Sequence, residues 1–279
     1  MNALELPPGL ALTPPRATPG PGTGTVTLLG AGPGDPELLT IKAVKALQRA
    51  RLVLYDHLVG EEVLALLPRD AERLYVGKRA ACHAMPQAAI CDTLVALARG
   101  GRDVLRLKGG DGYVFGRGGE EAEALAQAGI RFQVIPGITA AQGAAAAVGI
   151  PLTHRALGRS LVLATGHGRE GHELDLDWAQ LARPGQTVVI YMGVATLPTI
   201  CQRLIQHGLA TDTPAAVVER ATLPGQRCLV GSLATLPTLA RAAGVGSPAL
   251  IFIGEVVRLH GLDRKSKRLN SSPGYISYA

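Results

Sequence analysis

Short apolar runs alternate with amphipathic stretches along most of the chain, and this alternation restricts its possible folds more than any other feature. In the first half we expect strands at 25–29, 52–55, 73–76, 103–107 and 132–135, and helices at 36–49, 61–67, 86–99, 119–128 and 139–148. Strands and helices that alternate in this way are typical of a parallel sheet covered by helices on both faces. The sequence therefore predicts an α/β fold whose first sheet is mostly parallel.

The second half carries a less regular series of elements. We expect strands at 160–164, 187–191, 215–218, 227–230 and 249–253, and helices at 177–181, 197–207 and 233–242. The last strands lie close together along the chain, which favours a mixed sheet. The segment 149–158 contains a proline and has no clear period, so we place the domain border there.

The expected organisation has four parts. An N-terminal α/β domain at 24–152 precedes a C-terminal α/β domain at 153–262. The lead at 1–23 is rich in proline and is expected to be disordered. The tail at 263–279 has no apolar period and is expected to be flexible, outside both domains.

Composition excludes several classes of function. The formal charge of +6 includes four cations of residues 264–279, a segment without acids, so the remainder is nearly neutral. No basic stripe with interleaved aromatic residues suggests nucleic acid. No apolar run approaches the ~18 residues of a membrane span, and the first residues do not have the basic-then-apolar pattern of a signal peptide. The four cysteines lack metal or dithiol spacing, and three histidines lack metal-site spacing. We expect a cytoplasmic protein without a metal.

Unusual residues gather where the expected strands end. In open parallel sheets, ligands bind outside the carboxyl ends of the strands. The strands end in GAGPGD at 30–35, Asp56, GKR at 77–79, KGGD at 108–111, PGITA at 136–140, YMG at 191–193 and ERAT at 219–222. So many loops of unusual composition at strand ends predict one long cleft.

The glycine-rich loop at 30–35 leaves two ligand classes open. With Asp56 about 20 residues further on, it approaches the fingerprint of a nicotinamide-dependent oxidoreductase. However, Asp35 replaces the third glycine, and Asp35 and Glu37 flank the expected helix start, where they would repel a pyrophosphate. The loop therefore favours a ligand without phosphate, and the oxidoreductase remains the alternative.

A second glycine-rich segment, RLKGGDGYVFGRGGEE at 106–121, follows a strand and allows close backbone approach to a ligand. Arg106 and Arg117 within it would suit a polyanionic substrate. Arg79 and Arg155 are further candidates for binding acidic groups of such a substrate.

These motifs together resemble the tetrapyrrole methylase family over about 25–257. The resemblance rests on GAGPGDPELLT at 30–40, LVLYDHLV at 52–59, VGKR at 76–79, RLKGGD and VFGRGGEE within 106–121, PGITAA at 136–141, GIPLTHR at 149–155 and YMG at 191–193. The chain departs from the family pattern at Gly112 and Tyr113, where the family usually has Pro-Phe.

The resemblance implies two αβα domains, a homodimer, and S-adenosylmethionine in a cleft between the domains, with S-adenosylhomocysteine as its product. It implies methylation of uroporphyrinogen III at ring carbons 2 and 7 to give precorrin-2, on the routes to sirohaem and cobalamin. Another precorrin methylase, or a porphyrin-binding protein without activity, remains an alternative.

The resemblance also assigns roles to residues. It maps cofactor contacts onto Pro33, Gly109, Gly110, Asp111, Val114, Thr139, Ala140, Met192 and Ala221. It matches Asp56 to a proton acceptor and Lys78 to a proton donor.

Overall fold

The computed structural model describes residues 22–77, 85–167 and 174–261. The contacts divide the chain into two compact units, one from the N-terminal side to Ala31 with Leu39–Gly137, the other Gly32–Leu38 with the chain from Ile138 onward. Most of the expected lead, the whole of the expected tail, Lys78 and Arg79 lie outside the described residues. The domain border at 152/153 and the cleft between domains stay predictions.

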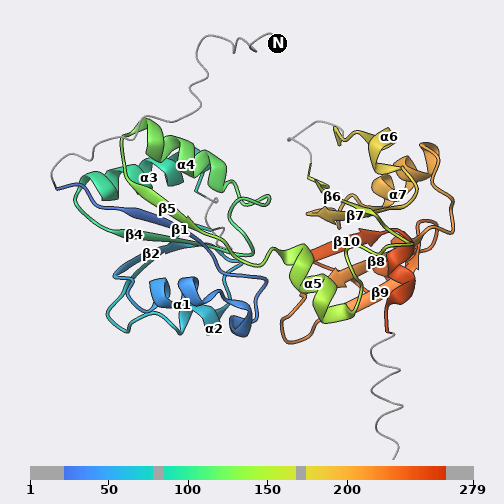
Figure 1. Ribbon diagram of the computed structural model, residues 1–279, viewed down its shortest axis with the longest axis horizontal. Helices are drawn as coiled ribbons and strands as arrows, with labels where there is room; N and C mark the ends of the chain where they lie inside the picture. Colours follow the sequence, from blue (N-terminus) through green and yellow to red (C-terminus); the bar gives the residue numbers. More distant parts are fainter. Residues whose placement is uncertain (1–21, 78–84, 168–173, 262–279) are drawn as a thin grey trace, which may run out of the picture. The chain divides into compact units, whose positions relative to one another are not determined.

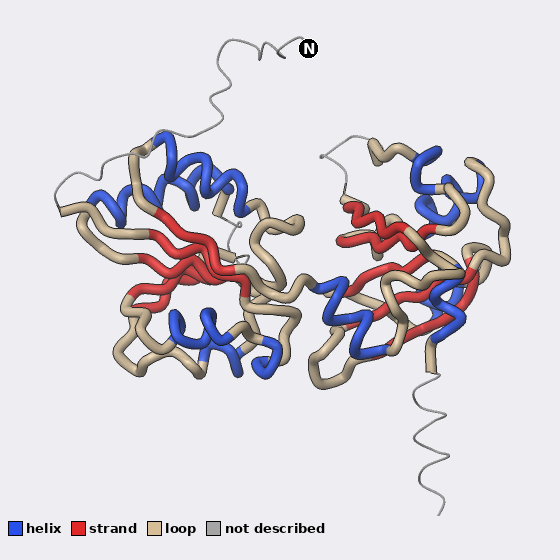
Figure 2. Tube along the Cα trace, viewed as in Figure 1, coloured by secondary structure: helices blue, strands red, loops and turns tan. Residues whose placement is uncertain are grey.

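The first unit contains a five-stranded parallel sheet (Figures 1 and 2). Its strands are β1 (Val26–Gly30), β2 (Leu52–Tyr55), β3 (Glu72–Tyr75), β4 (Val104–Lys108) and β5 (Phe132–Ile135). The order is β3-β2-β4-β1-β5, and every neighbouring pair is parallel. The predicted parallel sheet is confirmed, and the carboxyl ends of all five strands lie at one edge.

Helices cover both faces of this sheet, as Figure 1 shows. The helices α1 (Ile41–Leu47) and α2 (Glu61–Leu64) lie on one face, and α3 (Gln87–Arg99) and α4 (Gly118–Gln127) on the other. Successive side chains of a strand point to opposite faces, so Leu28 joins the core beneath α3 and α4 whereas Leu29 joins the core beneath α1 and α2. Burial on both faces explains the continuous apolar runs of these strands.

The expected helix at 36–49 is wrong as a single element. The chain forms a 3-10 turn, η1 (Pro36–Leu38), and α1 begins only after Thr40. The Asp35 carboxylate accepts the Glu37 N–H at 2.8 Å, whereas the Thr40 hydroxyl accepts the Ala43 N–H at 3.1 Å. Two separate caps therefore produce two elements, and the two acids lie before and within the 3-10 turn instead of at the start of α1.

Two other helices are shorter than expected. The helix α2 ends at Leu64, and the expected helix at 233–242 begins at Leu236 as α8 (Leu236–Ala242). The Leu233 N–H bonds to the Thr213 carbonyl oxygen at 3.0 Å, which holds this residue outside the helix.

The second unit contains a mixed five-stranded sheet, as predicted. Its strands are β6 (Ser160–Thr165), β7 (Gln186–Tyr191), β8 (Pro214–Glu219), β9 (Arg227–Ser232) and β10 (Ala249–Ile253), in the order β6-β7-β10-β8-β9. The β6–β7 pair is parallel and the other pairs are antiparallel.

One core of the second unit packs α6 (Trp178–Leu181), α7 (Leu197–Gln206) and α8 against this sheet. The helix α5 (Ala140–Val148) and the 3-10 helix η2 (Glu255–Leu259) both contact β10. Within the described ranges, no helix has the length and apolar character needed to cross a membrane.

Candidate functional site

Three glycines bring strand ends of the first unit into direct backbone contact. A Cβ on Gly30 would lie 2.6 Å from the Gly137 nitrogen, and a Cβ on Gly137 would lie 2.2 Å from the Gly110 carbonyl oxygen. The Ala31 N–H donates to the Lys108 carbonyl oxygen at 2.7 Å. Only glycine permits this approach, so the ends of β1, β4 and β5 converge at one edge of the sheet.

Asp111 ties two of these loops together. Its Oδ2 accepts the Gly137 N–H at 3.0 Å, and its Oδ1 accepts the Tyr113 N–H at 2.9 Å. The candidate cofactor residues of this unit all lie on the loop after β4 and are partly exposed: Gly109, Gly110, Asp111 and Val114.

The other candidate cofactor residues belong to the second unit: Pro33, Thr139, Ala140, Met192 and Ala221. The Pro33 ring packs against α5, because a Cβ on Gly143 would lie 2.4 Å from the proline Cγ. The Asp35 N–H donates to the Thr222 hydroxyl at 3.2 Å. These contacts join the segment 32–38 to α5 and to the loop that holds Ala221.

Tyr191, at the end of β7, holds the start of α5. Its phenolic oxygen accepts the Ala141 N–H at 3.0 Å and lies 2.6 Å from the Thr139 hydroxyl oxygen. The next residue, Met192, is 51% exposed and has φ of 55°. A buried tyrosine thus connects the N-cap of α5, the candidate Thr139, to the end of β7, which the candidate Met192 follows.

Backbone strain marks the loop after β8. Arg220 and Thr222 have φ of 50° and 65°, so the candidate Ala221 lies between two non-glycine residues in the left-handed region. The Gln226 side-chain oxygen accepts the Thr222 N–H at 2.7 Å and supports this conformation. Such strain clusters at ligand-binding sites.

Asp56 follows β2, and its carboxylate is held from two sides. Its Oδ1 accepts the Leu58 N–H at 3.2 Å, and its Oδ2 lies 3.4 Å from Nη2 of Arg106. The Asp56 side chain is 21% exposed. A half-buried carboxylate at a strand end can accept a proton from a bound ligand.

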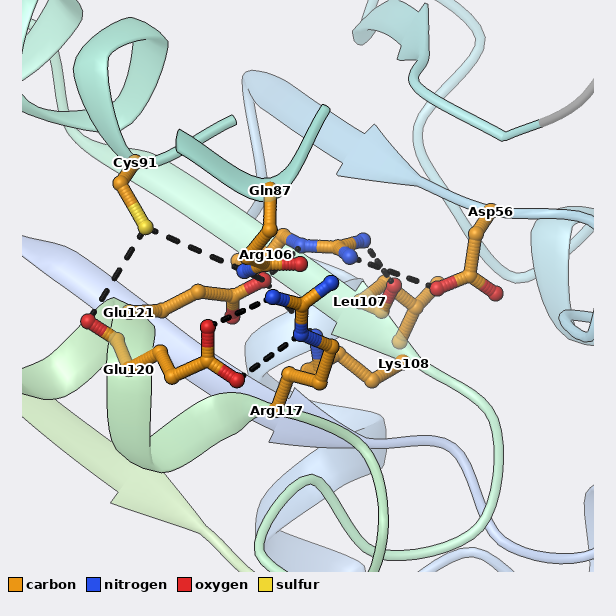
Figure 3. A network of polar contacts seen from close by, with 9 residues as sticks. All are labelled: Asp56, Gln87, Cys91, Arg106, Leu107, Lys108, Arg117, Glu120 and Glu121. Carbon is orange, nitrogen blue, oxygen red and sulfur yellow. Dashed lines mark hydrogen bonds and ion pairs between the residues drawn. The ribbon is translucent and has the colours of Figure 1, made fainter. Parts of the chain in front are cut away.

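Arg106 and Lys108 place two cations inside the first unit (Figure 3). Both side chains are almost fully buried, and both bond to Oε1 of Glu121, from Arg106 Nε at 3.1 Å and from Lys108 Nζ at 2.8 Å. Gln87 Nε2 donates to the same oxygen at 3.2 Å. The fully buried Glu121 carboxylate therefore neutralises charge that would otherwise destabilise the fold.

The pKa of Lys108 reflects both the burial of this cluster and its charges. Burial lowers the pKa of Lys108, the positive charge of Arg106 lowers it further, and Glu121 and Asp56 partly offset both effects. Glu121 Oε2 has no hydrogen-bond partner among the described residues, so the bonds to Oε1 hold this carboxylate in place.

Among the candidates for binding an acidic substrate, Arg117 and Arg155 are exposed. Arg117 forms two hydrogen bonds to Glu120, from Nε at 2.8 Å and from Nη2 at 2.7 Å, which raise the pKa of Arg117. Arg106 differs because its side chain is buried beside Glu121.

Comparison with known proteins connects this geometry to one family. The family model of the tetrapyrrole (corrin/porphyrin) methylases matches residues 25–237. The chain belongs to the tetrapyrrole methylase family.

Curated relatives of this chain are siroheme synthases. Siroheme synthases of Gluconacetobacter diazotrophicus and Nitrosospira multiformis are 58% identical over 235 residues and 55% identical over 240 residues, covering 84% and 86% of this chain. The chain spans about half the length of these curated relatives, 50% and 51%.

Solved structures of two methyltransferases resemble this chain over most of its length. Uroporphyrin-III C-methyltransferase of Thermus thermophilus, complexed with S-adenyl homocysteine, is 42% identical, with a TM-score of 0.73 over 85% of this chain and 94% of that chain. A cobalt precorrin-4 methyltransferase is 28% identical, with a TM-score of 0.74 over 89% of this chain and 99% of that chain.

Sequence reasoning on this chain missed the residues that support its candidate site from within: Gln87, Glu121, Tyr191 and Thr222. One signal was present for Glu121. The strand VLRLK at 104–108 carries two cations inside an apolar pattern, and buried cations require an acid nearby. No comparable signal identified Tyr191, whose partners lie about fifty residues away along the chain.

Clusters of metal-binding side chains are absent from the described residues. No group of three His, Cys, Asp or Glu side chains there could hold an ion.

Proposed function

We propose that this chain transfers methyl groups from S-adenosylmethionine to carbons 2 and 7 of uroporphyrinogen III, giving precorrin-2. The observation that carries the proposal is the likeness to uroporphyrin III C-methyltransferase of Thermus thermophilus, which is 42% identical with a TM-score of 0.72 and is covered over 100% of its chain. The siroheme synthases also support it, since their names place this family on the route to sirohaem.

The residues at the strand ends fit such a methyl donor. The backbone after β4 is partly exposed at Gly109 and Gly110, and Met192 is exposed. The donor supplies an electrophilic methyl group on a positively charged sulfur. Transfer to an electron-rich carbon depends on holding donor and acceptor in line, without a side-chain nucleophile. We assign this positioning to Pro33, Gly109, Gly110, Asp111, Val114, Thr139, Ala140, Met192 and Ala221.

Asp56 is the proposed proton acceptor. A proton must leave the methylated macrocycle before the product forms, and a positioned carboxylate accelerates that step. The Asp56 carboxylate has this position at the end of β2, where it is partly exposed. Lys78 is the proposed proton donor.

The acidic side chains of the substrate require cations. Uroporphyrinogen III carries eight carboxylates, and we assign their recognition to Arg79, Arg117 and Arg155. Arginine binds carboxylates in a bidentate manner. Because Arg117 already bonds Glu120, the substrate would have to compete with this acid.

We also propose that the protein acts as a homodimer in the cytoplasm. The chain mass is 29.0 kDa, so sedimentation equilibrium should give twice that mass. A single-chain mass at micromolar concentration would contradict the dimer. Among the described residues, Cys91, Cys201 and Cys228 form no disulfide, which suits a reducing compartment.

Cofactor titration separates this proposal from the nicotinamide-dependent oxidoreductase. Isothermal calorimetry should detect S-adenosylhomocysteine binding at micromolar concentrations and no heat from NAD⁺ or NADP⁺. Binding of a nicotinamide cofactor without binding of S-adenosylhomocysteine would overturn the proposed function.

A further inference from the structure

Arg106 occupies a position where a strand normally buries an apolar side chain. In the sheet it lies between Leu28 of β1 and Leu54 of β2. These two leucines belong to the core beneath α3 and α4, so Arg106 points to the same face. A charged side chain at such a position destabilises a fold unless other groups compensate it.

The guanidinium of Arg106 uses its donors in three directions (Figure 3). Its Nε donates to Glu121 Oε1 at 3.1 Å, and its Nη1 donates to the Leu107 carbonyl oxygen at 3.0 Å. Its Nη2 lies 3.4 Å from Asp56 Oδ2. Because the guanidinium is planar, the first two bonds set the direction of the third.

Glu121 does not need Arg106 to be neutralised. Lys108 Nζ lies closer to its Oε1, at 2.8 Å, and Gln87 donates to the same atom. The remaining donor, Nη2, is therefore available for a different contact, the one with the Asp56 carboxylate at the end of β2.

We propose that Arg106 is a positioning residue that orients the Asp56 carboxylate, with Glu121 holding the guanidinium in place from the core. Together with the Leu58 N–H on Oδ1, the Nη2 group restricts the carboxylate to one orientation. Arg106 thus acts through Asp56 and does not bind substrate. The inference rests on the proposed role of Asp56 as proton acceptor.

The substitution Arg106→Lys tests this role with little change of charge. A lysine ammonium can bond to Glu121, but it has a single nitrogen and cannot contact Asp56 at the same time in the fixed geometry of a planar guanidinium. We expect kcat for methylation of uroporphyrinogen III to fall about tenfold to a hundredfold, the effect of a misplaced catalytic group. KM for the tetrapyrrole and the Kd of S-adenosylhomocysteine should each change less than about twofold, because binding groups are untouched.

Lys108→Met is the matched control. It disturbs the same buried cluster by removing the Lys108 cation from Glu121, but it leaves the Arg106 contact with Asp56. We expect the thermal midpoint of Lys108→Met to fall, because Glu121 loses a cation, while kcat stays within about threefold of the parent. Arg102→Gln, which breaks an exposed ion pair with Glu72, should leave both quantities unchanged.

A double-mutant cycle with Asp56→Asn distinguishes the two proposals. Once Asp56 is replaced, Arg106→Lys should lower kcat less than about twofold further. If Asp56→Asn lowers kcat but Arg106→Lys retains the parent value, or if the two losses multiply, the inference on Arg106 is wrong and the proposed function stands. If the parent chain does not methylate uroporphyrinogen III, or if Asp56→Asn remains fully active, the role of Asp56 fails and the inference fails with it.

Discussion

At the scale of single residues, the buried ion pair of Arg106 with Glu121 links the core of the first unit to the candidate residue Asp56. Asp56 is accessible, but the cation that faces it is anchored to Glu121, which is 0% exposed. The sequence identified Asp56 from its place after a strand, and it predicted Arg106 as a candidate for binding an acidic substrate. It did not indicate that Arg106 turns inward, because strand direction alone does not determine which face becomes the core beneath α3 and α4.

Substitution of Asp56 is expected to separate turnover from binding. Asp56→Asn keeps the size of the side chain but removes the basic carboxylate, so kcat should fall about a hundredfold or more, within the range of general-base effects. The Kd of S-adenosylhomocysteine, measured by calorimetry, should stay within about twofold. An unchanged kcat would show that another group accepts the proton.

Removal of the Tyr191 hydroxyl is expected to loosen the start of α5. Tyr191→Phe leaves the buried Ala141 N–H without this acceptor, which costs about 1–3 kcal/mol. Thermal unfolding followed by circular dichroism should show the lower midpoint, and S-adenosylhomocysteine should bind more weakly. Tyr113→Phe, at a tyrosine that is 55% exposed, is the control and should leave the midpoint within error. Equal midpoints for both variants would remove the structural role of Tyr191.

Elements were predictable where the local pattern decides them. The strands at 52–55, 132–135 and 249–253 occur with the expected bounds, because each is a short apolar run between turn residues. The helix at 36–49 was wrong because side-chain caps at Asp35 and Thr40, which periodicity does not detect, divide it. The glycine loops were placed correctly at strand ends, but their backbone contacts join residues about a hundred positions apart.

Because the ends of β1, β4 and β5 are in close backbone contact, adding one methyl group at Gly137 should strongly destabilise the fold. Gly137→Ala would place Cβ 2.2 Å from the Gly110 carbonyl oxygen, which must move, so we expect a loss of about 2 kcal/mol or more in the free energy of unfolding. Gly119→Ala is the matched control, because nothing lies within 4 Å of its added Cβ in α4. It should leave stability unchanged or raise it by up to about 1 kcal/mol. Urea denaturation measures both variants, and equal stabilities would contradict the described contact.

The pairing of β8 with β9 predicts a pH dependence of stability. The Arg227 hydrogen bond to Glu219 lowers the pKa of Glu219 below the ordinary value of a glutamate. Stability from this bond is therefore full above the unfolded pKa and is lost as pH falls through the lower folded value. We expect Glu219→Gln and Arg227→Gln to flatten the fall of the thermal midpoint below about pH 5. A slope that stays equal to that of the parent in both variants would contradict the assignment.

The whole molecule combines two units with different sheets, each bringing part of the candidate cofactor set to its strand ends. The parallel and mixed sheets followed from the sequence pattern, and the family model over residues 25–237 agrees with them. The segment 32–38 was not predictable, since it continues from β1 in the first unit but groups with the second through Pro33 and Thr222. Such a crossing depends on contacts far apart in the sequence, which local patterns do not report.

Mass spectrometry of the reaction product tests the central claim most directly. Uroporphyrinogen III is incubated anaerobically with the protein and S-adenosylmethionine, and the tetrapyrrole is compared with a sample that contains Asp56→Asn. The account predicts a gain of two methyl groups with the parent chain and little product with the variant. An unchanged tetrapyrrole mass with the folded, S-adenosylhomocysteine-binding parent chain would contradict it.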